Sequence, residues 1–339
     1  MLTLRRGVVV QAGASEGSWQ QLSTEIAGER RTAVADIGLV GVCEEGDDVV
    51  VNVAAIDLAL GSGGADIVHV NLTRGLGATV DHDENVMKLN YTSLQHTVRP
   101  VEGRELNTPL EGVAAAFPLH GHLAPVAWAL AQARPGTRVG YVQTAGGALP
   151  GAISATVREL RERGLLAGHT TAGATYGGER EAITTPGAIH DGIVGQGWDV
   201  VLVGPGPGIL GSGSALGHGG IFALDSAHAA LALGCRTVLV ARMSSGDPRP
   251  RHQGLSHHTR TVLELLLAPV TLPVPLGATD PAFAAARARG HVVHEAHADL
   301  SGYSASGLPA RTMGRTLEAD QPFFAAALAA GTTLGGMLS

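Results

Sequence analysis

From about residue 109 onward, apolar runs of strand length alternate with alanine- and leucine-rich stretches of helix length. This alternation most constrains the fold, because strands separated by helices join through right-handed crossovers into a mostly parallel sheet. The strand-like runs are Val113–Phe117, Val139–Val142, Val200–Val203, Val238–Ala241, Val270–Val274 and His291–Val293. The helix-like stretches are Ala124–Ala133, Ile153–Arg163, Ala188–Gly195, Ile221–Leu233, His258–Leu267, Pro281–Arg289 and Asp320–Ala330. We expect a doubly wound, Rossmann-like α/β domain over residues 109–339.

Residues 1–108 have a different pattern, with short strand-like runs separated by turn signals and no helical period of useful length. The runs are Val8–Val10, Leu22–Ile26, Thr32–Ile37, Val49–Val53 and Ile67–Leu72. The turn signals are Ala12-Gly13, Glu45–Asp48 and Gly61–Gly64. Short strands at this spacing predict a small all-β, barrel-like domain ahead of the α/β domain.

Composition excludes several classes of partner. Charged residues make up 16% of the 339 residues, against an average of roughly 25%. A surface with so few charges indicates that part of it is covered, most simply in a homo-oligomer. The net charge is −7, Lys88 is the single lysine, and no basic tract occurs. A nucleic-acid partner is therefore disfavoured.

The cysteines and the apolar runs indicate a cytoplasmic protein without a membrane partner. Cys43 and Cys235 are far apart and form no Cys-x-x-Cys pair, which fits a reducing compartment. The N-terminus has no apolar core typical of a signal peptide. The longest apolar stretch, Leu265–Ala278, contains three prolines and is too short to span a bilayer.

In parallel sheets, ligands bind where loops leave the carboxyl ends of the strands. The first such loop, Tyr141–Pro150, contains Thr144, Gly146 and Gly147 before a helix start. It fits either an anion site at a helix N-terminus or an ordinary turn.

The second loop, Thr170–Glu181, contains Gly177 and Gly178, which permit close backbone approach. Its Glu179 and Glu181 fit acids, metal ligands or first-turn helix residues equally well.

The third loop, Val203–Gly220, carries Gly206, Gly208 and Gly211 in a G-x-G-x-x-G pattern. A chain with 48 glycines contains this pattern about once by chance, so the match has little weight. The next strand also ends at Arg242, where a site for NAD would have an acid. Arg242 would suit a 2′-phosphate instead. The glycines themselves permit a backbone path close to a ligand.

The fourth loop, Arg242–Thr259, is the most specific, because it gathers three histidines, three arginines and an aspartate. Arg249 and Arg251 can clamp a phosphate or carboxylate bidentately. In a second interpretation, Asp247 and the histidines hold a metal. His257 and His258 are adjacent and should point apart on a helix, and their spacing matches no zinc signature. An anion is therefore the preferred ligand.

Two further histidines, His120 and His122, follow the first strand of the α/β domain. They fit a capping or buried role as well as a functional one.

The whole chain resembles a bacterial family known as domain of unknown function 3866. The motifs that carry the resemblance are Val51–Gly64, Met87–Gln95, Thr144–Pro150, Tyr176–Ala182, Gly206–Ser214 and, most strongly, Arg242–Thr259. The family has an aspartate after the threonine of the first loop, whereas this chain has Ala145 there, so an acid at that position is not essential. The resemblance implies no reaction or cofactor. It singles out Lys88, which lies in a family motif with Tyr91 and Gln95 and would fold over the α/β site.

Three functions are consistent with these residues. The first is binding of an anionic, phosphorylated small molecule, with hydrolysis or group transfer preferred over redox chemistry. Arg249 and Arg251 would neutralise charge, an imidazole from the fourth loop would move the proton, and Asp247 or Glu179 would orient it. The imidazole candidates are His252, His257 and His258. A P-loop is excluded, because Val86-Met87 precedes the single lysine.

The second function is a metal-dependent hydrolase, which would draw its ligands from His252, His258, Asp247 and His120. The third is a non-catalytic ligand-sensing or assembly protein.

Overall fold

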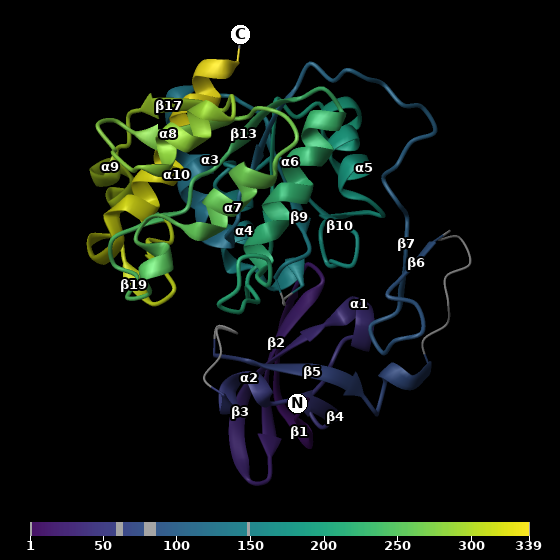
Figure 1. Ribbon diagram of the computed structural model, residues 1–339. Helices are drawn as coiled ribbons and strands as arrows, with labels where there is room; N and C mark the ends of the chain where they lie inside the picture. Colours follow the sequence, from purple (N-terminus) through teal and green to yellow (C-terminus); the bar gives the residue numbers. More distant parts are fainter. Residues whose placement is uncertain (1, 59–63, 78–85, 148–149, 339) are drawn as a thin grey trace. The chain divides into compact units, whose positions relative to one another are not determined.

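The computed structural model describes residues 2–58, 64–77, 86–147 and 150–338 (Figure 1). Contacts divide the chain into two compact units, Met1–Pro100 and Val101–Ser339.

The first unit is a closed five-stranded barrel in the order β1-β2-β3-β5-β4. Its strands are β1 (Leu4–Glu16), β2 (Trp19–Ile26), β3 (Glu29–Asp36), β4 (Asp48–Asn52) and β5 (Asp66–Asn71). Alternate residues point inward, so that Leu22, Val49 and Val51 join the barrel core. The unit also contains α1 (Ile37–Val40), α2 (Ala54–Asp57) and the antiparallel pair β6 (Val86–Lys88) and β7 (His96–Val98).

The second unit is built on an eight-stranded sheet in the order β11-β10-β9-β12-β8-β13-β16-β17, with every pair parallel. Its strands are β8 (Val113–Ala116), β9 (Val139–Thr144), β10 (Gly168–Ala172), β11 (Arg180–Ala182), β12 (Val200–Pro205), β13 (Arg236–Leu239), β16 (Thr271–Pro275) and β17 (Val292–Ala296). The central strands are buried on both faces, as a sheet covered by two helix layers requires.

Helices cover both faces of this sheet (Figure 1). One face packs on α3 (Leu123–Ala133), α4 (Ala155–Glu162), α9 (Leu300–Ala305) and α10 (Gln321–Met337). The other packs on α5 (Thr185–His190), α6 (Phe222–Ala232), α7 (His257–Leu265) and α8 (Ala282–Ala288). Along β8, Val113 and Ala115 belong to the first core, whereas Ala114 and Ala116 belong to the second face. This alternation is why the unit is doubly wound.

The strand order creates a topological switch point between β9 and β12. The chain leaves β9 through α4 toward β10 on one side, and leaves β12 through α6 toward β13 on the other. The two loops therefore diverge and open a crevice at the carboxyl edge of the sheet, where ligands bind in such folds.

The fold class expected from the sequence, a doubly wound parallel domain preceded by a small barrel, is confirmed. The sequence did not predict β10, β11 or α9. The segment Thr170–Glu181, expected as a single loop, contains the end of β10 and the start of β11. Most of the turn expected at 61–64 and residues 148–149 of the first loop lie outside the described residues. No helix in the described ranges is long and apolar enough to cross a membrane.

Candidate functional site

A pocket of about 630 Å³ lies at the switch point. It is lined by the loops that follow β9, β10 and β12: Ala145, Gly146, Gly147, Ala174, Thr175, Leu210, Gly211, Ser212, Leu216, Gly217, His218, Gly219, Ile221 and Phe222. Among these residues only His218 has a titratable side chain. The pocket wall is otherwise glycine backbone, hydroxyls and apolar groups.

Glycines of the first and third loops let the two backbones touch. A Cβ on Gly147 would lie 2.4 Å from the carbonyl oxygen of Gly206, and the φ of Gly146 is +107°. Leu210 donates its backbone N–H to the Gly146 carbonyl over 3.2 Å. Much of the glycine density predicted to face a ligand therefore serves loop-to-loop packing.

The G-x-G-x-x-G pattern does not lead directly into a helix. Gly206, Gly208 and Gly211 are followed by an exposed turn, and the next helical residues are the short helix η5 (Gly219–Ile221) and then α6. A dinucleotide fingerprint places its pyrophosphate on a helix that starts within the motif. The exposed turn that follows Gly211 therefore differs from a dinucleotide fingerprint.

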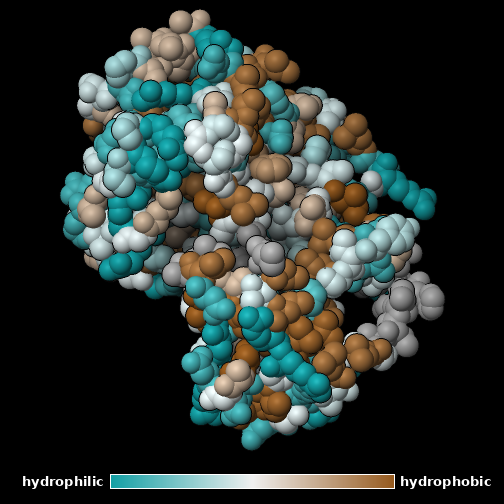
Figure 2. Space-filling model, turned by 60° about the horizontal axis from the view of Figure 1, so that its bottom comes forward, coloured by the Kyte–Doolittle hydropathy of each residue, from teal (hydrophilic) through white to brown (hydrophobic). Residues whose placement is uncertain are grey.

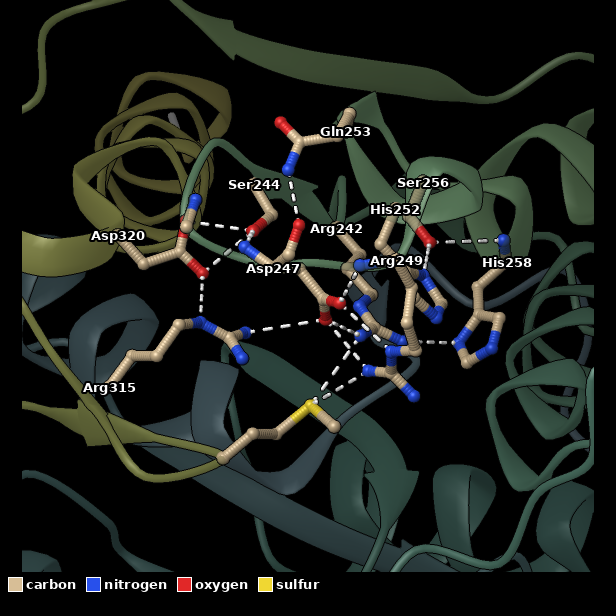
Figure 3. A network of polar contacts seen from close by, with 12 residues as sticks. Arg242, Ser244, Asp247, Arg249, His252, Gln253, Ser256, His258, Arg315 and Asp320 are labelled. Atoms are coloured by element: carbon tan, nitrogen blue, oxygen red, sulfur yellow. Dashed lines mark hydrogen bonds and ion pairs between the residues drawn. The ribbon is translucent and has the colours of Figure 1, made fainter.

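The fourth loop is held by a buried ion-pair network around Asp247 (Figure 3). Asp247 is fully buried and receives two hydrogen bonds from the Arg249 side chain, at 2.8 and 2.7 Å. Arg242 and Arg315 lie 3.4 and 3.5 Å from the same carboxylate. The hydrogen bonds and the positive charge of Arg249 hold the pKa of Asp247 well below its usual range. Asp247 therefore stays ionised and orients arginines, whereas the sequence had suggested that it orients a histidine.

A second buried carboxylate anchors the same loop to the start of α10. Asp320 accepts hydrogen bonds from Ser244 Oγ and from the backbone N–H of Ser245 (Figure 3). It also pairs with Arg315 at 2.9 Å. The antiparallel pair β14 (Met243–Ser244) and β15 (Gly254–Leu255) closes the loop at its base.

The network leaves an excess of positive charge. It contains Arg242, Arg249 and Arg315 against the two carboxylates Asp247 and Asp320. Arg251 adds another positive charge and has neither an ion pair nor a hydrogen bond within the described ranges. A Cβ on Gly213 would lie 3.9 Å from Nη1 of Arg251, so this exposed guanidinium lies beside the turn that lines the pocket.

Four histidines gather next to these arginines, and we call them the loop histidines: His218, His252, His257 and His258. His218 comes from the third loop and stacks on His258 with ring centroids 3.6 Å apart. The His257 ring lies 4.5 Å from that of His258 and 5.2 Å from that of His218. His252 lies 4.9 Å from His257. The sequence missed His218, although it is the single titratable residue of its loop.

Each loop histidine is neutral at pH 7. Burial, aided by Arg242 and Arg249, lowers the pKa of His252 to about 3. Burial, His218 and Arg251 lower the pKa of His257 to about 4. The pKa values of His218 and His258 are also lowered, mainly by burial. Neutral imidazoles can accept a proton or bind a metal.

The hydrogen bonds of the loop histidines fix which nitrogens are open. His218 Nε2 donates to the Ala215 carbonyl at 2.9 Å, so its Nδ1 carries the lone pair. That Nδ1 and His257 Nε2 are buried without a hydrogen-bond partner among the residues described. His258 Nδ1 accepts from Arg242 Nη1 at 2.9 Å. His252 Nδ1 lies 2.7 Å from Ser256 Oγ, which also caps α7.

One group in the described part of the chain can hold a metal through histidines. Ligand atoms of His218, His257 and His258 lie within 4.8 Å of one another. Contrary to the expectation that His257 and His258 point apart, their rings converge, because α7 begins at His257 and both side chains turn toward His218. Asp247 is in ion pairs with arginines instead.

The other sequence candidates lie elsewhere. Thr144 is buried at the end of β9, and its hydroxyl donates to the Ala145 carbonyl. The backbone N–H of Gly177 donates to Glu181, and that of Gly178 donates to Thr171 and Glu181. Glu179 pairs with Arg161 at 2.6 Å. Lys88 belongs to the first unit, where it is buried on β6.

A second histidine set, the core histidines His120, His122 and His169, lies against the face covered by α3 and α10. His169 stacks on Tyr141 at 5.0 Å and His122 stacks on Phe323 at 4.4 Å. His120 Nε2 lies 2.9 Å from Ser154 Oγ. Burial lowers the pKa of His120 to about 4 and those of His122 and His169 to about 3.

Comparison with known proteins gives a family and no function. Residues 32–331 match a family described as protein of unknown function (DUF3866). No curated protein matches the chain. Among solved structures, the chain is similar to YjeQ from Thermotoga maritima at 15% identity and a TM-score of 0.17, with 65% of each chain covered. A similarity this weak carries no argument about fold or function.

Proposed function

The chain belongs to the DUF3866 family, and from the geometry of its site we propose that it binds an anionic, phosphorylated small molecule at the carboxyl edge of its parallel sheet. The observation that carries this proposal is the excess positive charge of the arginine network beside the switch-point pocket. Arg251 is the residue we assign to direct contact with the anion, because its guanidinium is exposed and unpaired within the described ranges.

The pocket supports the proposal through its position. It opens where the loops after β9 and β12 diverge, which is the usual ligand position in doubly wound sheets. The backbone N–H groups of Leu210, Ser212, Gly217 and Gly219 on its wall already donate within the loops. The arginines are therefore the groups that supply charge to an anion.

Hydrolysis or group transfer is the reaction class that suits these residues. A neutral imidazole accepts a proton from water or a hydroxyl group, and His218 lines the pocket with its Nδ1 lone pair set by the Ala215 carbonyl. We assign His218 as the proton acceptor of the metal-free protein, with His257 as its nearest alternative. Metal-dependent hydrolysis is the second candidate, favoured by the three convergent histidines.

The binding proposal is tested by calorimetric titration of metal-free protein with inorganic phosphate and pyrophosphate. Arg251→Ala should weaken binding at least about fivefold, because it removes a charge-assisted contact. The matched control is Arg287→Ala, which removes an exposed arginine near the end of α8. Unchanged pyrophosphate affinity in Arg251→Ala, or an equal loss in the control, would refute the anion assignment.

We propose a homo-oligomer, since large apolar side chains such as Leu210, Leu216 and Leu267 are exposed and apolar patches lie on the face shown in Figure 2. Native mass spectrometry of the protein as purified would count the subunits and would also identify a bound ligand by its mass.

We assign the protein to the cytoplasm, because both cysteines are free and buried.

A further inference from the structure

We propose that His218, His257 and His258 form a site for one divalent transition-metal ion of the zinc class, at the wall of the switch-point pocket. This inference goes beyond the proposed binding of an anion and does not rest on it, because the metal can be titrated without any anionic ligand. The ion would lie between the third and fourth loops, where it would face whatever molecule occupies the pocket.

Three histidine side chains from two loops converge at the proposed site. The three ligand atoms lie within 4.8 Å of one another although His218 comes from a different loop than the other two. A tetrahedral zinc ion with bonds of about 2.1 Å holds its nitrogens about 3.4 Å apart. The rings of His218 and His258 are stacked 3.6 Å apart and nearly parallel, so at least one of them must rotate for both ring planes to contain the ion. Three nitrogen ligands leave the fourth position open to water or substrate, as in catalytic zinc sites.

Two ring nitrogens at the proposed site have no hydrogen-bond partner among the described residues. His218 is 5% exposed, and its Nδ1 has no hydrogen-bond partner in the described part of the chain. His257 Nε2 is in the same state. Buried polar atoms without partners are rare, and each one calls for an explanation. A metal ion would satisfy both nitrogens at once.

A backbone carbonyl behind His218 orients its ring. Its Nε2–H donates to the Ala215 carbonyl at 2.9 Å, which fixes the tautomer with the lone pair on Nδ1. Histidines that bind metals commonly donate their other ring N–H to a carbonyl or a carboxylate in this manner.

His258 couples the metal site to the arginine network. Its Nδ1 accepts a hydrogen bond from Arg242, which also lies 3.4 Å from Asp247 (Figure 3). Coordination through His258 Nδ1 would release Arg242 toward Asp247. Because the surroundings already carry excess positive charge, an anion in the pocket should strengthen metal binding. We therefore expect phosphate to increase the affinity for zinc.

The test uses the full chain, stripped of metal with a chelator and titrated with Zn²⁺ by calorimetry. The metal content after gel filtration is then measured by mass spectrometry. One zinc per chain is expected, and Co²⁺ in its place should show the visible absorption of a tetrahedral nitrogen site. His218→Gln and His257→Gln should each weaken zinc binding at least about tenfold. His294→Gln is the control, because His294 is an exposed histidine of β17.

Each outcome decides the proposal. Zinc that is not retained, or that binds His218→Gln as tightly as the wild type, would overturn it. His257→Gln keeps the test decisive if His218→Gln fails to fold, because His257 is only half-buried. If His218→Gln or His257→Gln loses zinc binding but still binds pyrophosphate in its metal-free form, the metal site is supported and the anion site is unaffected. The reverse result would remove the metal site alone.

Discussion

The two histidine sets of the α/β unit lie on different helices, strands and loops, and they meet different neighbours. In both sets burial lowers the pKa, and in both a histidine lies next to a serine that caps a helix: His120 beside Ser154 of α4, and His252 beside Ser256 of α7. The core histidines stack on aromatic rings. The loop histidines lie among arginines, and His218 lines the pocket.

A lowered histidine pKa therefore does not by itself locate a site. Desolvation has the same effect in an aromatic core as at a pocket wall. What distinguishes the loop histidines is their convergence, the position of His218 at the pocket wall, and the charge around them. Three sets of variants test this difference.

Asp247→Asn should have the largest effect, because it removes the charge that holds the surroundings of the loop histidines together. It leaves the buried Arg242 without its charged partner and removes the ion pair that holds Arg249 in place. We expect a loss of about 3–5 kcal/mol in the free energy of unfolding, measured by urea denaturation.

The control for that variant is Glu159→Gln, which breaks the partly exposed pair with Arg163 in the same unit. It should cost about 0.5 kcal/mol or less. Equal losses in the two variants would mean that the Asp247 network does not support the fourth loop.

His122→Phe should remove part of the acid sensitivity of the core histidines. The folded pKa of His122 is about 3, whereas an unfolded histidine titrates near 6.5. The contribution of His122 to the free energy of unfolding is therefore fully present above pH 6.5. It is lost as the pH falls toward 3, because over this range only the unfolded state takes up the proton. Between pH 6.5 and pH 5 one such histidine costs about 2 kcal/mol.

Phenylalanine keeps the stacking on Phe323 and removes two buried ring nitrogens that lack partners within the described ranges. Between pH 7 and pH 5 the free energy of unfolding should fall by about 2 kcal/mol less in the variant than in the wild type, measured by denaturation at each pH. An unchanged pH dependence would show that His122 protonates in the folded protein.

The serine caps give the smallest and most direct contrast. Ser154→Ala and Ser256→Ala should each cost about 1 kcal/mol, because each removes the N-cap of a helix. Zinc affinity should fall only in Ser256→Ala, since Ser256 caps the helix that carries His257 and His258. Thermal unfolding and zinc titration of the pair measure both effects, and a similar loss of zinc affinity in Ser154→Ala would contradict the separation of the two sets.

The sequence predicted the fold class because apolar strand runs and alanine-rich helices alternate visibly. It missed β10, whose residues Gly168–Ala172 include a histidine and two threonines although every one is buried. Such a strand lacks the apolar run that marks its neighbours. The sequence also placed three loop histidines in one candidate site, yet it missed His218, Arg315 and Asp320. These residues are far away along the chain, and only the folding of their loops brings them to the fourth loop.

A crystal structure of the zinc-loaded protein, with anomalous data collected at the zinc absorption edge, would show whether the loop histidines bind the metal. We predict one strong peak about 2.1 Å from nitrogens of His218, His257 and His258, with Arg242 turned toward Asp247. A peak at the core histidines, or no peak near His218, would contradict the claim that the loop histidines form the binding site of this fold.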